Sequence, residues 1–531
     1  MPREFQVVDL FAGPGGLAEG FSAYKRPDGS RPFRIALSVE KEASAHDTLR
    51  LRAFLRQFDD GFPPEYYQAL NAGKPLPLWS ELYPEEWQAA ENEALRLELG
   101  TPSANSVVAS RISAIRRSAG DDTILIGGPP CQAYSLVGRA RNRGIADYSA
   151  EEDSRHFLYR EYIAVLRRLQ PAAFIMENVK GILSSSVEGQ FVFERILMDL
   201  RNCGGMDNYV LVPIAPSGHD ELDLGEQVRP KDFVVRAEQH GIPQARHRVI
   251  IVGLRRDVGG RQPKLGQLQD MDSSSQVLTR HVLDGMPPIR SGLSDQDDDG
   301  AAWRQTLRAA MKDVVEALSQ QMGSRSDLAV SARKTMAEFK ASQETLERES
   351  TRRAGVAKDC PPALSKWLTD PRLKVTLNHA ARSHMTTDLG RYFYCAVFTA
   401  LKGRSPKSDE FPEQLAPDHA NWRSGKFADR FRAQFFGAPS TTVTSHISKD
   451  GHYFIHPDPL QCRSLTVREA ARLQTFPDNY LFLGNRTQQY VQVGNAVPPL
   501  LAYKIAATLA STLGALNSES SKSRRQVKAT A

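Results

Sequence analysis

The sequence predicts an α/β protein in which a doubly wound, mainly parallel sheet is followed by a second, smaller domain. Short apolar strands alternate with helical patterns through the first 260 residues, which is typical of a sheet covered by helices on both faces. A glycine-rich turn at 13–16 joins the first strand to the first helix. Near residue 260 the composition shifts toward Ser, Asp and Gln, and this shift marks the expected domain boundary.

Composition and charge narrow the class of protein. The 531 residues allow two or more domains with a large core, and 41% of them are hydrophobic. A net charge of +6 is compatible with nucleic acid binding but does not demonstrate it. The five cysteines are widely spaced without a CxxC pair, which argues against a disulfide framework or zinc site and fits a reducing cytoplasm. We expect no metal site, no membrane span and, because a strand begins at Phe5, no signal peptide.

The apolar runs predict the order of the elements. Strands are expected at 5–10, 33–39, 123–126, 172–176, 209–212 and 249–253, and helices at 156–169, 191–200, 303–339, 466–474 and 500–513. Residues 51–105 are less regular, and we interpret them as an insertion between the second and third strands, with a charged helix at 81–99. The basic segment 516–531 is expected to be a disordered tail.

The stretch 127–135, Gly-Gly-Pro-Pro-Cys-Gln-Ala-Tyr-Ser, follows the buried strand at 123–126. Two glycines allow a tight turn and two prolines stiffen it, so Cys131 is presented on a rigid loop. The loop lies at the carboxyl end of a parallel strand, where open α/β sheets bind their ligands. A packed structural thiol is the alternative, but the flanking Pro130 and Gln132 favour a nucleophile.

Polar side chains follow other strands at the same edge. Glu40 ends the second strand roughly twenty residues beyond the glycine turn, where a carboxylate can bind a ribose hydroxyl. Glu177 follows the strand at 172–176, and burial there would favour a protonated carboxyl, although a plain strand-end glutamate is the alternative. On a strand, Arg246 and Arg248 would point to one face and form a cationic wall for a pyrimidine carbonyl and a phosphate.

These motifs together make the chain resemble the DNA (cytosine-5)-methyltransferase family. The resemblance rests on the Pro-Pro-Cys-Gln loop and on five further blocks in the family's order. They are Asp9 to Gly16, Glu177 to Val179, Gln244 to Arg248, Arg463 to Pro477 and Gln492 to Pro499. Residues of about 51–105 and 260–435 lie outside the resemblance. It implies a Rossmann-like S-adenosylmethionine-dependent methyltransferase domain, 1–260 completed by 485–515, and a target-recognition domain at 261–484.

The resemblance also implies roles for individual residues. Cys131 would attack C6 of a flipped cytosine, Glu177 would meet the base at N3, and Arg246 and Arg248 would hold its O2 side. S-adenosylmethionine would be held by residues of the first, second and last motifs, namely Phe11, Gly13, Gly15, Glu40 and Asn495. Counting back from the catalytic loop puts Ser110 where the family usually has an acid against the adenine, so no adenine contact is assigned. The block from Arg463 to Pro477 would support the recognition domain.

The expected partner is double-stranded DNA, bound by a monomer. DNA contacts are expected from Gln132 and Ser135 in the catalytic loop, from Arg139 among spaced arginines after it, and from Thr442. A solvated basic loop and simple β propensity are the respective alternatives for Arg139 and Thr442. Methylation as part of a restriction-modification system would pair the protein with a cognate restriction endonuclease. RNA cytosine methylation and a catalytically silent DNA-binding relative are the competing functions.

Overall fold

The computed structural model describes residues 3–130, 158–187, 190–215, 229–259, 267–268, 276–294, 296–342, 344–417, 422 and 430–529. Four of the predicted site residues, Cys131, Gln132, Ser135 and Arg139, lie outside the described residues. The remaining predicted site residues can all be placed.

The main sheet has the strand order β3-β2-β1-β4-β5-β11-β8, with β9 paired to β11. The strands from β3 to β5 are parallel, and β11 runs antiparallel to β5, β8 and β9. Their bounds are β1 Phe5–Leu10, β2 Phe33–Glu40, β3 Ala94–Arg96, β4 Thr123–Gly127, β5 Ala173–Val179, β8 Tyr209–Val212, β9 Val234–Arg236 and β11 His247–Arg255. The order reverses between β1 and β4, so the carboxyl ends of these two strands flank the position where such sheets bind ligands.

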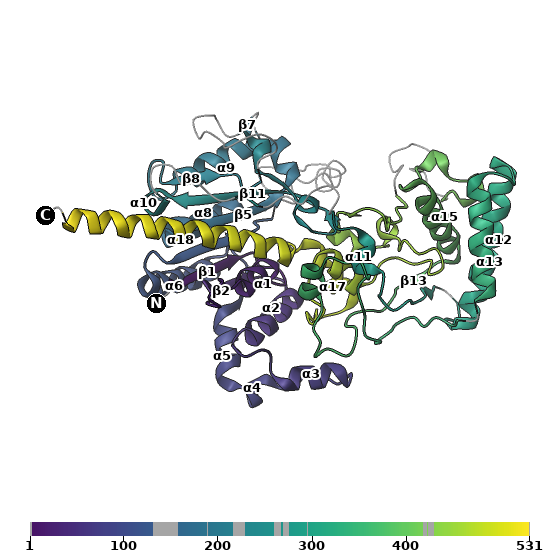
Figure 1. Ribbon diagram of the computed structural model, residues 1–531, viewed down its shortest axis with the longest axis horizontal. Helices are drawn as coiled ribbons and strands as arrows, with labels where there is room; N and C mark the ends of the chain where they lie inside the picture. The colour runs from purple at the N-terminus through teal and green to yellow at the C-terminus, as the bar shows by residue number, and fades with distance from the viewer. Residues whose placement is uncertain are drawn as a thin grey trace.

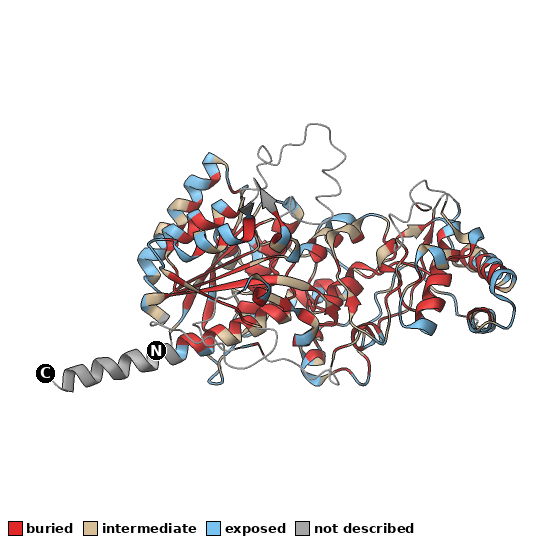
Figure 2. Ribbon diagram, turned by 90° about the horizontal axis from the view of Figure 1, so that it is seen from above, coloured by how far each residue is buried: buried red, intermediate tan, exposed pale blue. Residues whose placement is uncertain are grey.

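Helices cover both faces of the sheet, which confirms the doubly wound prediction (Figure 1). On one face lie α1 (Gly16–Ala23) and α18 (Pro499–Ala529), where Leu501, Ile505 and Leu509 share a buried core with Phe5 and Val7. On the other face lie α6 (Pro102–Ala119), α8 (Leu158–Leu169) and α9 (Val192–Arg201). The strands are buried between these layers, while exposed residues gather on the outer sides of the helices (Figure 2).

The last helix lies beside the first strand, as the sequence predicts, but it is longer than expected. It continues to Ala529, so most of the segment expected to be a disordered tail extends α18. By length and composition alone, the helical segment Arg486–Gly514 could cross a membrane. However, 67% of its most apolar 18-residue stretch is buried inside the protein. Its apolar side chains therefore belong to the protein core.

The insertion after β2 has a different structure from the one expected. It contains α2 (Ala43–Leu55), α3 (Pro64–Asn71), α4 (Trp79–Leu82) and α5 (Pro84–Glu93). The predicted helix at 81–99 ends at Glu93, because the following residues pair with β2 as β3. That edge pairing overrides the helical pattern. Ser110 lies exposed within α6, so the residues after β3, and not Ser110, reach the sheet edge beside Glu40.

Residues 276–484, which we call the second lobe, carry a separate hydrophobic core. The core packs α12 (Gly300–Met322), α13 (Asp327–Ala341) and α15 (Thr386–Lys402) around Trp303, Phe339 and Tyr392. Helices therefore occupy 303–339, as predicted. Figure 1 shows these three helices at the far end from the sheet. The remaining short elements are α10 Arg256–Gly259, α11 Thr279–Leu283, α14 Pro362–Leu368, α16 Val467–Leu473, α17 Arg486–Asn495, β6 Ser186–Val187, β7 Gln190–Phe191, β10 Gln244–Ala245, β12 Gly292–Leu293, β13 Ser383–His384 and β14 Ser440–Thr441.

Candidate active site

The glycine turn after β1 is a tight, open loop. Phe11, Gly13 and Gly15 all have positive φ, with values of 56°, 57° and 99°. Gly15 caps α1, and a Cβ there would come within 2.9 Å of Leu49 Cδ1. A Cβ on Gly13 would meet nothing within 4 Å. The turn thus leaves room beside Gly13, just before the N-terminus of α1, which suits a small ligand.

Glu40 closes the same turn from the second strand. Its Oε2 accepts a hydrogen bond from the Gly13 N–H at 2.8 Å, and its Oε1 accepts from the amides of Lys41 and Glu42. Phe11 lies half-buried at the end of β1, next to the end of β2. The structure therefore brings Phe11, Gly13, Gly15 and Glu40 together, as the sequence predicts.

The return of the chain through α17 and α18 completes this corner. The Val497 carbonyl packs so closely on Gly16 that a Cβ there would lie 2.2 Å from it. Asn495, the last residue of α17, is exposed two positions earlier. Tyr480 donates its hydroxyl to the Pro14 carbonyl of the turn. Sequence reasoning missed Tyr480, because a tyrosine just after a helix has no local signal for a contact 466 residues away.

The second predicted group lies at the ends of β5 and β11. Arg248 Nε is 2.9 Å from Glu177 Oε1, and both side chains are 13% exposed. Burial lowers the pKa of Arg248 below its ordinary value. The charge of Glu177 and their hydrogen bond oppose this effect but do not reverse it. A Cβ on Gly128 would be 3.1 Å from Glu177 Oε2. The carboxylate therefore lies against the loop that leads to Cys131.

Asn178 fixes that loop to β5. Its side-chain nitrogen donates to the Pro129 carbonyl at 3.2 Å, and its oxygen accepts from the Val179 amide. Asn178 is 4% exposed. The described part of the loop, up to Pro130, is therefore held against the end of β5, beside Glu177. Asn178 was not among the predicted site residues, although it stands in the same motif as Glu177.

Arg246 does not lie within the strand that carries Arg248. It falls between β10 and β11, where the charges of Arg248 and Glu177 both act on it. Its guanidinium is 2% exposed and donates to the carbonyls of Val443, Gly494 and Ala496. Burial lowers its pKa well below the ordinary value, and the nearby charge of Arg248 adds to this effect. Arg246 joins the sheet domain to the segments beside β14 and α17, and its buried Nε has no hydrogen-bond partner among the described residues. Its predicted contact with a base remains a prediction.

Thr442 lies on this same junction. Its hydroxyl donates to the Ala245 carbonyl at 2.6 Å, and β10 pairs with β14 in parallel next to it. Gln244 supports the pairing, because its side chain accepts from the Val443 amide and donates to the Leu473 carbonyl. The structure gives Thr442 an internal hydrogen bond. Its predicted DNA contact remains a prediction.

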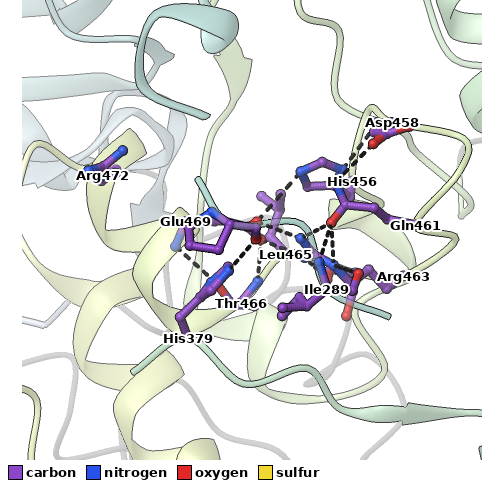
Figure 3. Close-up of polar contacts among 12 residues, drawn as sticks. Ile289, His379, His456, Asp458, Gln461, Arg463, Leu465, Thr466, Glu469 and Arg472 are labelled. Carbon is purple, nitrogen blue, oxygen red and sulfur yellow. Dashed lines mark hydrogen bonds and ion pairs between the residues drawn. The ribbon is translucent and has the colours of Figure 1, made fainter. Parts of the chain in front are cut away.

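A buried polar network supports the motif from Arg463 to Pro477 (Figure 3). Thr466 and Glu469 form the predicted capping box of α16. Both Glu469 oxygens accept from Arg463 at 2.7 Å, and both side chains are fully buried. His379 bridges Thr466 Oγ1 and the Pro287 carbonyl. Burial alone would raise the pKa of Glu469, but Arg463 and His456 lower it well below its usual range.

Comparison with known proteins agrees with this geometry. The sequence profile of the C-5 cytosine-specific DNA methylase family matches residues 105–511. The chain is 33% identical over 517 residues to the type II methyltransferase M.Bpa9945I of Bacillus paralicheniformis, covering 94% of this chain and 97% of that protein. It is 27% identical over 421 residues to the DNA (cytosine-5-)-methyltransferase M.ApeKI of Aeropyrum pernix, covering 75% and 82%.

The fold is also similar to a crystal structure described as a DNA modification methyltransferase encoded within an E. coli prophage. The TM-score is 0.52 at 18% identity, and the match covers 96% of this chain and 100% of that one. The sheet and its ligand-binding edge thus define a Rossmann-like methyltransferase of the S-adenosylmethionine-dependent class. Within that class, the chain belongs to the C-5 cytosine-specific DNA methylase family, and it is a DNA (cytosine-5)-methyltransferase.

The cofactor of this family fits the glycine corner. S-adenosylmethionine is a small ligand, and the open space above Gly13 beside Glu40 and Phe11 suits it. The residues that would hold it come from the first strand, the second strand and the end of α17.

Proposed function

We propose that the protein methylates C5 of a cytosine in a specific duplex DNA sequence by covalent catalysis through Cys131. The observation that carries this proposal is the Glu177–Arg248 pair packed against Gly128, in the loop that leads to Cys131. A carboxyl and a cation beside a loop that continues to a cysteine support chemistry on an electron-poor ring. Family membership supplies the substrate class, a cytosine in DNA.

Each group has a defined task in this proposal. The Cys131 thiolate adds to C6, which moves electron density to C5, the atom that receives the methyl group. Glu177 meets N3 and the exocyclic amine, and stabilises the adduct as N3 gains a proton. Arg248 holds the O2 side of the base and, through its ion pair, the orientation of Glu177. Loss of the C5 proton and elimination of the cysteine then release the product.

Bound S-adenosylmethionine would supply an electrophilic methyl group at this edge. Glu40 would hold the ribose, Phe11 would pack on the adenine, and Gly13, Gly15 and Asn495 would line the site. Three backbone carbonyls fix the guanidinium of Arg246, its buried Nε has no hydrogen-bond partner among the described residues, and its role at the O2 side of the base stays part of the proposal. Neither C5 nor C6 is accessible within a stacked duplex, so the base must flip out of it at a cost of roughly a few kcal/mol.

The wider setting follows from the relatives. Several of them are named type II methyltransferases, which supports a role in restriction-modification and a partner restriction endonuclease. We propose that the protein acts on DNA in the cytoplasm as a monomer. Gln132, Ser135 and Arg139 would contact DNA from the catalytic loop, and Thr442 from the second lobe.

Adduct trapping tests the covalent route. The protein is incubated with S-adenosylmethionine and a random-sequence duplex pool in which 5-fluorocytosine replaces cytosine, because fluorine at C5 blocks the final elimination. We expect a denaturation-resistant complex and a modified peptide that contains residue 131. Cys131→Ser should form no complex, whereas Cys360→Ser, a matched change in the second lobe, should form it. Turnover on ordinary duplex DNA without any adduct at residue 131 would exclude this mechanism, and turnover on transfer RNA alone would redirect the substrate.

A further inference from the structure

The insertion after β2 has a surface that is poorly suited to DNA. Residues 56–93, the part of the insertion after α2, carry eight acidic side chains and only two basic ones, and Glu93 and Arg56 among them are paired with each other. Such a surface repels phosphates, and DNA-binding surfaces are basic. Helix α3 instead contacts the second lobe, and its contacts are specific.

Two adjacent tyrosines of α3 hold two segments of the second lobe. The Tyr67 hydroxyl donates to Asp370 Oδ2 at 2.6 Å, and the Tyr66 hydroxyl donates to the Asn479 carbonyl at 2.8 Å. The Asn479 side chain also donates to Asp370 Oδ2 at 2.8 Å, which closes the network. Asp370 is 9% exposed. A buried carboxylate thus joins three separate parts of the chain.

The end of α3 adds a second attachment. The Asn71 side chain donates to the Arg372 carbonyl at 3.0 Å and accepts from the Lys374 amide at 2.7 Å. It therefore binds the backbone of the second lobe much as a neighbouring strand would. The Arg372 guanidinium lies 4.5 Å from the centre of the Tyr67 ring, where it also pairs with Asp370.

Apolar contacts support these polar ones. Leu373 and Leu377 of the second lobe are buried in one core with Tyr66, Leu70 and Trp79 of the insertion. Apart from the bond between Tyr66 and Asn479, both the hydrogen-bonded and the apolar parts of this contact come from residues 370–377. Tyr480 follows Asn479 directly and donates to Pro14, so the same loop also touches the cofactor turn.

We propose that the insertion is an interdomain clamp that fixes the second lobe relative to the methyl-transfer edge of the sheet. Tyr67 and Asn71 are its positioning residues, and residues 370–377 are the segment that it holds. The clamp keeps bound DNA and the cofactor corner in one geometry. This consequence for catalysis rests on the proposed function, whereas the clamp itself can be tested in the free protein.

Hydrogen exchange of the free full-length protein tests the clamp directly. Tyr67→Phe removes one hydrogen bond to a charged group, so we expect the amides of 370–377 to exchange about tenfold faster. Tyr83→Phe is the matched control, because its hydroxyl donates at 2.9 Å to Glu65 within the insertion. It should leave exchange at 370–377 unchanged. Asn71→Asp, at a half-buried position, keeps the acceptor for Lys374 and loses the donor, and should accelerate exchange less.

Kinetics then separate positioning from general destabilisation. For Tyr67→Phe we expect a several-fold lower kcat with saturating DNA and an unchanged Kd for S-adenosylmethionine by calorimetry. Unchanged exchange at 370–377 in both Tyr67→Phe and Asn71→Asp would overturn the clamp, whatever the activity. Faster exchange with unchanged kcat would overturn its catalytic role. If the wild-type protein showed no methyl transfer to duplex DNA, the proposed function would be wrong, whereas the exchange results would still test the clamp.

Discussion

The catalytic edge of the sheet and the base of the second lobe each pair a glutamate with an arginine, yet the two pairs differ. Glu177 and Arg248 are partly exposed, and Arg248 Nε lies 2.9 Å from Glu177 Oε1. Glu469 and Arg463 are fully buried and joined by two contacts of 2.7 Å, and the Thr466 amide donates to the same carboxylate. One pair can still meet a substrate, whereas the other is committed to the fold.

The difference shows how use of hydrogen-bonding capacity separates a site from a scaffold. A carboxylate has about four acceptor positions, and buried ones must be filled to offset desolvation. Those of Glu469 are filled by groups of the protein itself. Arg246 lies between these cases, since three carbonyls accept from its terminal nitrogens while its buried Nε has no hydrogen-bond partner among the described residues. Sequence motifs alone cannot make this distinction.

Substitution of Glu177 gives the most direct test of this difference between the two pairs. We expect Glu177→Gln to lower kcat by roughly 10²–10⁴-fold, because the amide keeps the shape but lacks the carboxyl group that stabilises the adduct as N3 gains a proton. Thermal stability and the Kd for S-adenosylmethionine should stay near the wild-type values. Single-turnover methylation of duplex DNA measures the effect. A variant that loses stability but not rate would place Glu177 with Glu469 among the scaffold residues.

The reverse result is expected at Glu469. Glu469→Gln leaves Arg463 buried beside a neutral partner, and breaking a buried pair costs about 3–5 kcal/mol. Urea unfolding should show this loss in the free energy of unfolding. Glu413→Gln, an exposed change in the same lobe, should cost little. Equal stabilities for the two variants would show that the buried pair contributes no net specificity or stability to the lobe.

The carboxyl edge of the sheet could be predicted because its signals are local. Gly13 and Gly15 mark a turn, Glu40 and Glu177 end apolar strands, and a parallel sheet brings strand ends together. The capping box at Thr466 was equally local. Each of these predictions depends on a few neighbouring residues and on the regular spacing of apolar residues along a strand or helix.

The parts that could not be predicted depend on contacts distant in the chain. Nothing around Arg246 shows that its partners lie about 200 residues or more away, at Val443 and Ala496. The short strand β3 interrupts an expected helix because β2 offers an unpaired edge. The sequence around α3 is irregular, and nothing in it indicates that its tyrosines bind Asp370 and Asn479, which lie far away in the chain.

Glu40 is intermediate between the catalytic pair and the buried pair. It binds the Gly13 amide within the fold, and it also lies at the open edge of the sheet. We expect Glu40→Ala to weaken S-adenosylmethionine binding by about tenfold or more, through loss of a charged hydrogen-bond acceptor. DNA binding should change far less. Calorimetry with each ligand separates the two effects. An equal loss for both ligands would mean that Glu40 supports the fold and has no direct part in cofactor binding.

The smallest effect is expected at Asp370, which, like Glu469, accepts hydrogen bonds from other groups of the protein. Burial would raise its pKa, but hydrogen bonds from Arg372, Tyr67 and Asn479 prevail and lower it from 3.8 to about 2. Because the folded pKa is the lower one, this stabilisation is present above pH 3.8 and is lost as the pH falls through about 2. Across that window, the free energy of unfolding should fall more for wild type than for Asp370→Asn. Urea unfolding at several pH values measures the slopes, with the exposed Asp59→Asn as the control that keeps the wild-type slope. If Asp370→Asn kept that slope as well, the hydrogen bonds of Asp370 would add no acid-sensitive stability to the junction.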